Sequence, residues 1–259
     1  MQVPNCMGAM GRAILLLAAA VLAVATAAPA SAHPVGVRVA PLRHAATTAA
    51  RPRPQAERHD DAFTLVEAQN GAVVRSRPNG PIAGELPGRT SLGTTTWLWA
   101  VRTSLDGRWA QVVLPWRPNG RTGWISLRGR RTVKSRIWVE ADVSRRRVNL
   151  MRGGQVVRSF VAAVGTAASP TPVGRFSVTD PIATGDPGGP FGWYAFGLSG
   201  HQPNLPAGWS GGDQLAIHGT NAPSSLGTAA SAGCLRVSST ALGTLKRYLL
   251  PGTPVIIEA

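Results

Sequence analysis

Cysteine, lysine and acidic residues are scarce in this chain of 259 residues. The two cysteines are Cys6 and Cys234, and so few cysteines exclude a disulfide-rich scaffold. Lysine occurs only at positions 134 and 246, and Asp and Glu total 12 against 27 Lys and Arg, for a formal net charge of +15. Arginine therefore carries the charge, and the charge suits anionic surroundings.

Two further absences narrow the class of protein. Histidines and carboxylates nowhere cluster with metal-ligand spacing, so we expect no metal and no other cofactor, and full activity in chelator. The aromatic residues are not interleaved with a basic stripe, and no nucleic-acid-binding module is present, so we expect no nucleic-acid partner. An anionic cell envelope fits the charge better.

The N-terminus has the features of a secretory signal peptide. Arg12 precedes an apolar run over 13–28, and Ala30-Ser31-Ala32 is a small-x-small cleavage site. We predict a signal peptide over 1–32, cleaved after Ala32, and export to the periplasm or cell wall. The alternative, an uncleaved membrane anchor, is disfavoured because the apolar run is short for a membrane span.

Cleavage would leave Cys234 as the only cysteine of an exported protein. No intramolecular disulfide is then possible, and an unpaired thiol in an oxidising compartment is a liability unless it is buried or used. Residues 33–61 are rich in Ala, Pro and Arg, which predicts a disordered tether. A folded terminal strand is the alternative, and the prolines disfavour it.

Short strands and turns follow over 62–131. The segments 63–68 and 94–101 have strand character, and turns at 78–80, 106–107 and 119–120 separate further strands. Five short strands suit a small β-barrel. The order VRSRP, GRWAQV, GRTGWI resembles a bacterial SH3-like domain.

Tryptophans are concentrated in this first domain. Alternation predicts Trp97 and Trp99 on one face of a strand. One interpretation is that they belong to the barrel core, and the other is that they form an aromatic groove for glycan or peptide.

A histidine and a cysteine frame the most informative stretch, IHGTNAPSSLGTAASAGCLRV at 217–237. A thiol attacks carbonyls as thiolate, and a neighbouring imidazole is its usual activator. His218 ends a predicted strand, and turn-forming residues allow Cys234 to fold back to it. The N–H groups of Gly233 and Cys234 are then candidates for an oxyanion hole. The alternative is a structural histidine and a small buried cysteine.

The motif IHGT followed by S-x-G-C-L-R resembles the active-site signature of the L,D-transpeptidases of YkuD type. The resemblance implies that Cys234 is the acylated nucleophile and His218 its base, with the carbonyl of Gly219 orienting the imidazole. Ser231 and Arg236 match further motif positions, with Arg236 expected to bind substrate. The family's second histidine is replaced by Ala232, which puts rate and acceptor in doubt more than reaction class.

The rest of the second domain, 137–259, is predicted to be mostly β. The segment 169–180 resembles the family's T-P-x-G-x-F scaffold, and 132–136 is expected to be a connector. Residues 181–213 have few strand signals, which predicts an irregular lid or substrate loop. In that loop Trp193 and Tyr194 are candidate pocket residues, whereas His201 is interpreted as incidental and Asp213 as a local partner only.

The chain ends with a helix and a strand. Ser238 and Ser239 are candidate helix caps, and Leu242, Leu245 and Leu249 form one apolar face. Pro251-Gly252 ends the helix, and 253–258 reads as a buried final strand.

These observations predict a mainly β protein, with an SH3-like barrel followed by an L,D-transpeptidase-type β-sandwich and a short C-terminal helix. The resemblance implies that a Cys234 acyl-enzyme cross-links peptidoglycan stem peptides after expulsion of a terminal D-alanine, and that carbapenems acylate the thiol. The alternatives are an L,D-carboxypeptidase, with water as acceptor, and a non-catalytic wall-binding protein. We expect a monomer.

Overall fold

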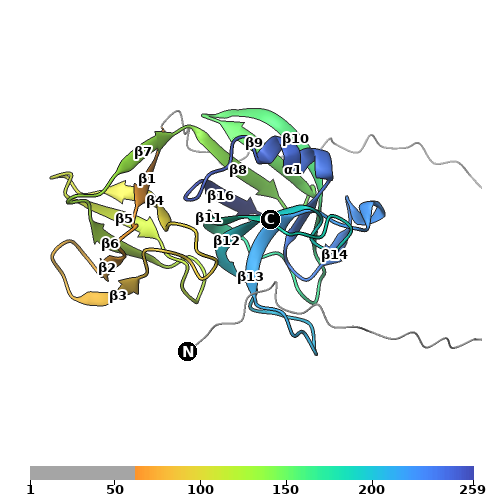
Figure 1. Cartoon of the computed structure of the whole chain (residues 1–259), viewed down its shortest axis with the longest axis horizontal. Coiled ribbons are helices and arrows are strands. Elements are labelled where there is room, and N and C mark those ends of the chain that lie inside the picture. Colours follow the sequence, from red (N-terminus) through yellow and green to blue (C-terminus); the bar gives the residue numbers. More distant parts are fainter. Residues whose placement is uncertain (1–61) are drawn as a thin grey trace, which may run out of the picture. The chain divides into compact units, whose positions relative to one another are not determined.

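The computed structural model describes residues 62–259, which form β-strands, one α-helix and one short 3-10 helix (Figure 1). The predicted signal peptide and tether lie outside the described residues. Within 62–259, no helix combines the length and the apolar character needed to cross a bilayer. The strands form two sheets, one of seven strands and one of nine, so the expectation of a mainly β protein is confirmed.

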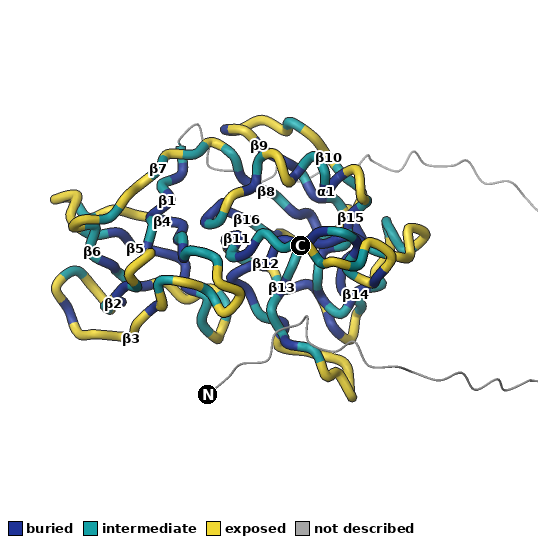
Figure 2. The backbone as a smooth tube through the Cα atoms, in the orientation of Figure 1, coloured by how far each residue is buried: buried dark blue, intermediate teal, exposed yellow. Residues whose placement is uncertain are grey.

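The first sheet is antiparallel throughout, with strand order β3-β2-β6-β5-β4-β1-β7. Its interior side chains come from alternate positions, such as Val74, Val112 and Ile125, which have no exposed surface. Exposed residues gather at turns, as between β2 and β3 (Figure 2). The strands are β1 Phe63–Glu67, β2 Ala72–Arg75, β3 Ile82–Leu86, β4 Trp97–Thr103, β5 Trp109–Val113, β6 Thr122–Ser126 and β7 Thr132–Ser135.

Strand β7 replaces the connector expected at 132–136. It pairs with β1, and Thr64 lies opposite Lys134. The sequence does not predict this strand, because its four residues are polar or half-exposed and show no hydrophobic alternation. That the first sheet is an SH3-like barrel stays a prediction.

The second sheet has the order β14-β10-β15-β13-β12-β11-β16-β8-β9. Strand β10 pairs with β9 through its first part and with β15 and β14 through its last residues, so the sheet closes on itself into a sandwich-like body. The strands are β8 Ile137–Asp142, β9 Arg147–Arg152, β10 Gln155–Gly165, β11 Gly174–Ala183, β12 Tyr194–His201, β13 Gln214–His218, β14 Ala229–Ser231, β15 Leu235–Val237 and β16 Pro254–Glu258.

The C-terminal helix and strand are confirmed. Helix α1 spans Ser239–Leu245, and the Ser238 hydroxyl caps it by accepting a hydrogen bond from the Ala241 N–H. Leu242 and Leu245 are fully buried in the core of the second sheet. Strand β16 lies between β11 and β8, as expected of a buried strand. The 3-10 helix η1 spans Pro223–Ser225.

Strand β12 corrects the expectation of an irregular segment over 181–213. Every residue of β12 except the last is buried, so the strand shows no polar–apolar alternation. Its glycines permit close packing, because a Cβ on Gly200 would lie 2.6 Å from the Phe176 ring. The chain therefore places a central strand where the composition indicated a loop.

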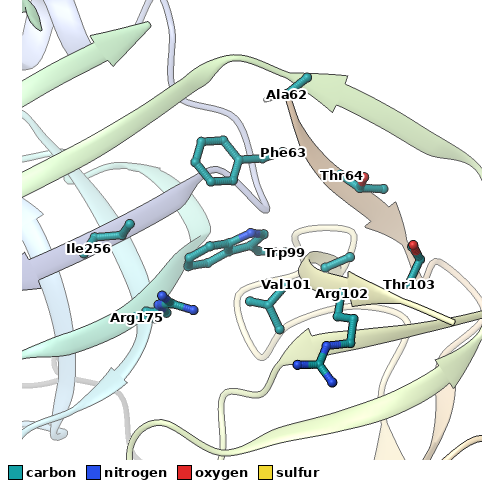
Figure 3. Close-up of a pocket in the computed structure, with 10 residues that line it drawn as sticks. Ala62, Phe63, Thr64, Trp99, Val101, Arg102, Thr103, Arg175 and Ile256 are labelled. Atoms are coloured by element: carbon teal, nitrogen blue, oxygen red, sulfur yellow. The ribbon is translucent and has the colours of Figure 1, made fainter. Parts of the chain in front are cut away.

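Trp97 and Trp99 do not share one groove. Trp99 is buried and meets Phe63 edge-on with ring centroids 5.6 Å apart, in an apolar cluster that also contains Trp138. Trp99 also borders a cavity of about 300 Å³, which Arg175 and Ile256 line from β11 and β16 (Figure 3). Trp97 lines a different cavity. The interpretation of Trp99 as a core residue is the correct one.

Candidate active site

Strands β13 and β15 run parallel and adjacent, and they bring the two halves of the motif together. Ile217 lies opposite Leu235, and His218 lies opposite Arg236. Cys234 immediately precedes β15. The η1 turn and the short strand β14 occupy the loop between the two halves, so the chain folds back as the turn-forming residues predict.

The register puts the thiol and the imidazole on one face of the sheet. Ile217 and Leu235 face the core, so His218, Arg236 and Cys234 face the other way. Strand spacing of about 4.8 Å and a rise of about 3.3 Å per residue put the Cα atoms of Cys234 and His218 about 8 Å apart. Within residues 62–259 no hydrogen bond joins the two side chains, and such bonds often tighten only when substrate binds.

His218 is buried in a position that favours its neutral form. Its Nδ1 lies 2.6 Å from the Gly219 carbonyl oxygen, so Nδ1 carries the proton and Nε2 is left as the basic nitrogen. The Phe191 ring packs edge-on against the imidazole at 4.9 Å. Burial lowers the pKa of His218 to about 4; the hydrogen bond to Gly219 opposes this shift and the charge of Arg236 adds to it.

Cys234 is partly exposed, so the residue keeps contact with solvent. Desolvation of its sulfur raises the pKa of the thiol. A backbone hydrogen bond from Ala216 and the positive charge of Arg236 lower this pKa, but their effect is smaller. The thiol is therefore protonated at neutral pH and needs a base before it can attack a carbonyl.

Arg236 acts electrostatically on both candidate catalytic residues. Its charge lowers the pKa of both His218 and Cys234. Its Nε is buried and has no hydrogen-bond partner in the part of the chain that the structure describes. A buried unpaired donor is costly, so this atom is suited to bind an acceptor oxygen of a ligand.

Ser231 and Gly233 shape the turn that presents Cys234. The Ser231 hydroxyl donates to the Cys234 carbonyl at 2.6 Å and accepts from the Gly233 N–H at 3.0 Å. Gly233 has φ +117°, a conformation that favours glycine. Because the Gly233 N–H is already engaged, Cys234 supplies the better candidate of the two backbone donors considered for an oxyanion hole.

The structure separates Trp193 and Tyr194 from the thiol side of the sheet. Ala195 lies opposite His218, so the neighbouring Tyr194 points to the core face, where it packs against Phe196. Tyr194 is 8% exposed, and the ammonium of Lys246 lies 4.5 Å from its ring centroid. Trp193 packs against the same core. The register therefore gives Tyr194 a structural position, not one beside Cys234.

Gln202 contacts the turn over 231–234 that presents Cys234, called the nucleophile turn below, and no local sequence pattern predicts this contact. Its buried amide Nε2 donates to the carbonyls of Pro170 and Ala232, at 2.9 and 3.1 Å. A Cβ on Gly233 would lie 2.0 Å from this nitrogen. The side chain thus ties the 169–172 segment to the turn that holds Cys234. Only the fold brings these three segments together.

His201 and Asp213 form a separate group. Their side chains are 3.1 Å apart, and Asp213 also pairs with Arg117 of the first sheet. Asn119 exchanges two hydrogen bonds with the backbone of His201, at 2.7 and 2.8 Å. His201 is therefore hydrogen-bonded to the loop at 115–119, so its position is structural and not incidental. Within 62–259, no group of three or more potential metal ligands is present.

The second domain is mainly β, and it brings Cys234, which immediately precedes β15, near His218 at the end of the adjoining parallel strand β13. The family model for the L,D-transpeptidase catalytic domain, YkuD, matches residues 136–257. The chain is 33% identical over 131 residues to the YkuD protein of Bacillus licheniformis, and 30% identical over 120 residues to that of Bacillus subtilis. Both relatives carry a provisional L,D-transpeptidase name. The chain belongs to this family.

The matches cover only part of each protein. They span 51% of this chain and 70% of the B. licheniformis protein, and 46% of this chain and 65% of the B. subtilis protein. A solved L,D-transpeptidase from Mycobacterium smegmatis aligns over 62% of this chain and 82% of its own, with 17% identity and a TM-score of 0.40. That similarity is too low to support a conclusion.

Proposed function

We propose that the protein is a peptidoglycan L,D-transpeptidase in which Cys234 is the nucleophile. The sulfur attacks the carbonyl of the third residue of a donor stem peptide, a diamino acid. The C–N bond to the terminal D-alanine breaks, leaving a thioester. An amine from a neighbouring stem then attacks the thioester, so a new amide forms and the thiol is released. Family membership and the shared sheet face of Cys234 and His218 support this proposal.

His218 moves the proton in this reaction. Its burial keeps the imidazole neutral at physiological pH, and the Gly219 carbonyl fixes the tautomer that leaves Nε2 free to accept the thiol proton. The resulting imidazolium protonates the D-alanine amine as it leaves. Because the pKa of His218 is lowered and the pKa of Cys234 is raised, both side chains are neutral before substrate binds. The proton then moves from the sulfur to Nε2 during the attack.

Backbone and arginine donors complete the site. The Cys234 N–H is the proposed oxyanion donor, and Ser231 holds its turn in place through two hydrogen bonds. The unpaired Nε of Arg236 is proposed to bind an oxygen of the donor peptide. Substrate contacts of Trp193 and Tyr194 stay predictions, which their position on the core side disfavours.

The parallel register of β13 and β15 is the observation that carries this proposal. Product masses from a disaccharide-tetrapeptide substrate test it. With an added amine acceptor we expect a cross-linked product and free D-alanine. A hydrolysed tripeptide alone would indicate a carboxypeptidase, and an unmodified substrate together with no carbapenem adduct would indicate a wall-binding protein.

L,D-transpeptidases are generally cell-envelope enzymes, which agrees with the export predicted from residues 1–32. We propose that the first sheet is an SH3-like wall-binding module and that the protein acts as a monomer. Light scattering of the purified chain tests the second point, since a mass of about twice the monomer would contradict it.

The burial of His218 predicts a pH-dependent stability. The pKa of this histidine falls from 6.5 to about 4 on folding, so the unfolded chain binds its proton more readily between these values. Stability from this group is full above pH 6.5 and is lost as pH falls toward 4, by about 3 kcal/mol. The free energy of unfolding is measured with denaturant at several pH values for wild type and His218→Gln. The difference between the two pH dependences is the contribution of the histidine. Parallel curves would contradict the assignment.

Gln202 is predicted to be a positioning residue. Gln202→Leu removes the donors that hold the carbonyls of Pro170 and Ala232, so we expect a loss of about 1–3 kcal/mol of stability. Misplacement of the nucleophile turn should also slow carbapenem acylation, by about 10-fold or more. The maximal acylation rate should fall more than the apparent affinity. The matched control is Gln111→Leu, which removes an exposed hydrogen bond to Thr122. Equal acylation rates in both variants would exclude positioning.

A further inference from the structure

A second cavity, of about 330 Å³, lies between loops and strands of the first sheet and strands β11, β12 and β13 of the second. Trp97 and Trp116 line it from the first sheet, and Asp180, His201 and Gln214 line it from the second. Its size is at the lower end of small-molecule sites. The nucleophile chemistry proposed above does not use it.

One lining residue of the cavity, Gln214, belongs to β13, the strand that ends with the candidate base. Gln214 and Ala216 are two positions apart on β13 and share a face with His218. Ala216 in turn donates a backbone hydrogen bond toward the Cys234 sulfur. Two residues of strand span about 7 Å, so a substrate of several units could reach both places. On β12, His201 lines the cavity and the next residue, Gln202, contacts the nucleophile turn.

The lining is unusual for so basic a protein. The chain has 27 Lys and Arg, yet no lysine or arginine lines this cavity, whereas Asp180 and Asp213 do. Asp180 is 2% exposed and accepts a hydrogen bond from the Thr90 hydroxyl. Asp213 is neutralised by its ion pair with Arg117, so Asp180 is the lining carboxylate for which residues 62–259 provide no cationic partner. A carboxylate accepts hydrogen bonds from uncharged hydroxyl groups and disfavours an anionic ligand. The carboxylate of Asp180 therefore favours a neutral, hydroxyl-bearing ligand over an anionic one.

The two tryptophans provide flat apolar surface beside these acceptors. The guanidinium of Arg131 lies 5.2 Å from the Trp97 ring centroid, and that of Arg121 lies 5.3 Å from the Trp116 ring centroid. These contacts hold the indoles in place. A ring with an apolar face and a hydroxyl-bearing edge, which is the structure of a sugar, matches this combination of indole and carboxylate.

We propose that this cavity binds a sugar ring of the glycan strand to which the donor peptide is attached. The proposal rests on the proposed function, because it takes the glycan from the same substrate. Binding remote from the reacting carbonyl would help to place the stem peptide at Cys234.

The test compares two substrates and one sugar probe with the full chain. We expect wild type to use a disaccharide-tetrapeptide with a kcat/KM about tenfold higher than the free tetrapeptide, and Trp116→Ala to bring the ratio close to one. Calorimetry with chitobiose, an uncharged disaccharide, should show binding to Cys234→Ala protein that disappears when Trp116→Ala is added. Trp124→Ala is the matched control, because Trp124 does not line the cavity.

Several outcomes would overturn the proposal. They are an unchanged substrate ratio in folded Trp116→Ala, no chitobiose binding to wild type, or displacement of chitobiose by free tetrapeptide, which would mark a peptide site. If Trp116→Ala does not fold, Gln214→Leu takes its place, because it removes a polar lining group at similar volume. Chitobiose binding without turnover of either substrate would defeat the proposed function and leave the sugar site standing.

Discussion

Cys234→Ala is expected to eliminate both D-alanine release and cross-linking. No other group in the proposed mechanism can form the thioester, and loss of a covalent nucleophile lowers turnover by about 10³-fold to 10⁶-fold. Release of D-alanine from a disaccharide-tetrapeptide, followed by mass spectrometry, measures the effect. Cys234 is partly exposed and outside the hydrophobic clusters, so the variant should remain folded, which circular dichroism checks.

The matched control for this prediction is Cys6→Ala, which removes the chain's other thiol. Its activity should equal that of the wild type, because signal-peptide cleavage is predicted to remove Cys6. Turnover by Cys234→Ala at more than about one per cent of the wild-type rate would assign the nucleophile to another residue.

His218→Gln is expected to lower the rate of carbapenem acylation by about 10²-fold to 10⁴-fold at pH 7. Glutamine retains polarity but cannot take the thiol proton. The shape of the pH profile should change as well. In wild type the pKa of His218 is about 4, so the neutral base is present from about pH 5 upward and the rate should vary little with pH there.

Without the base, acylation depends on spontaneous ionisation of the thiol. Burial raises the pKa of Cys234, so the rate of His218→Gln should rise about tenfold per pH unit through neutral pH. Stopped-flow acylation between pH 5 and 9 measures both profiles, and His59→Gln, in the predicted tether, is the matched control. Superimposable profiles for wild type and His218→Gln would exclude general-base catalysis by this residue.

Local signals were sufficient to predict much of the second domain. The Ser238 cap and the leucines of α1 fix a helix through contacts within a few residues, and β16 is a continuous apolar run, so both are readable from sequence. Strand β12 was missed because burial on both faces removes the alternation that marks a half-buried strand. Its Gly197 and Gly200 also have the composition of a loop.

The candidate site was predictable only in its motif residues. The order of His218, Gly219, Ser231 and Cys234 along the chain carries the family resemblance. The contacts of Gln202 and the direction of Tyr194 depend on register between strands that are distant in sequence. Trp97 and Trp116 line one cavity together with residues of the second sheet, and no local sequence pattern indicates that they share it.

Peptide mapping of the trapped acyl-enzyme tests the central claim most directly. The wild-type chain is mixed briefly with disaccharide-tetrapeptide, quenched in acid and digested. The peptide that contains Cys234 should gain the mass of the donor less D-alanine, as a thioester that hydroxylamine removes. A stable adduct on any other residue, or D-alanine release with no adduct under any quench time, would contradict nucleophilic attack by Cys234.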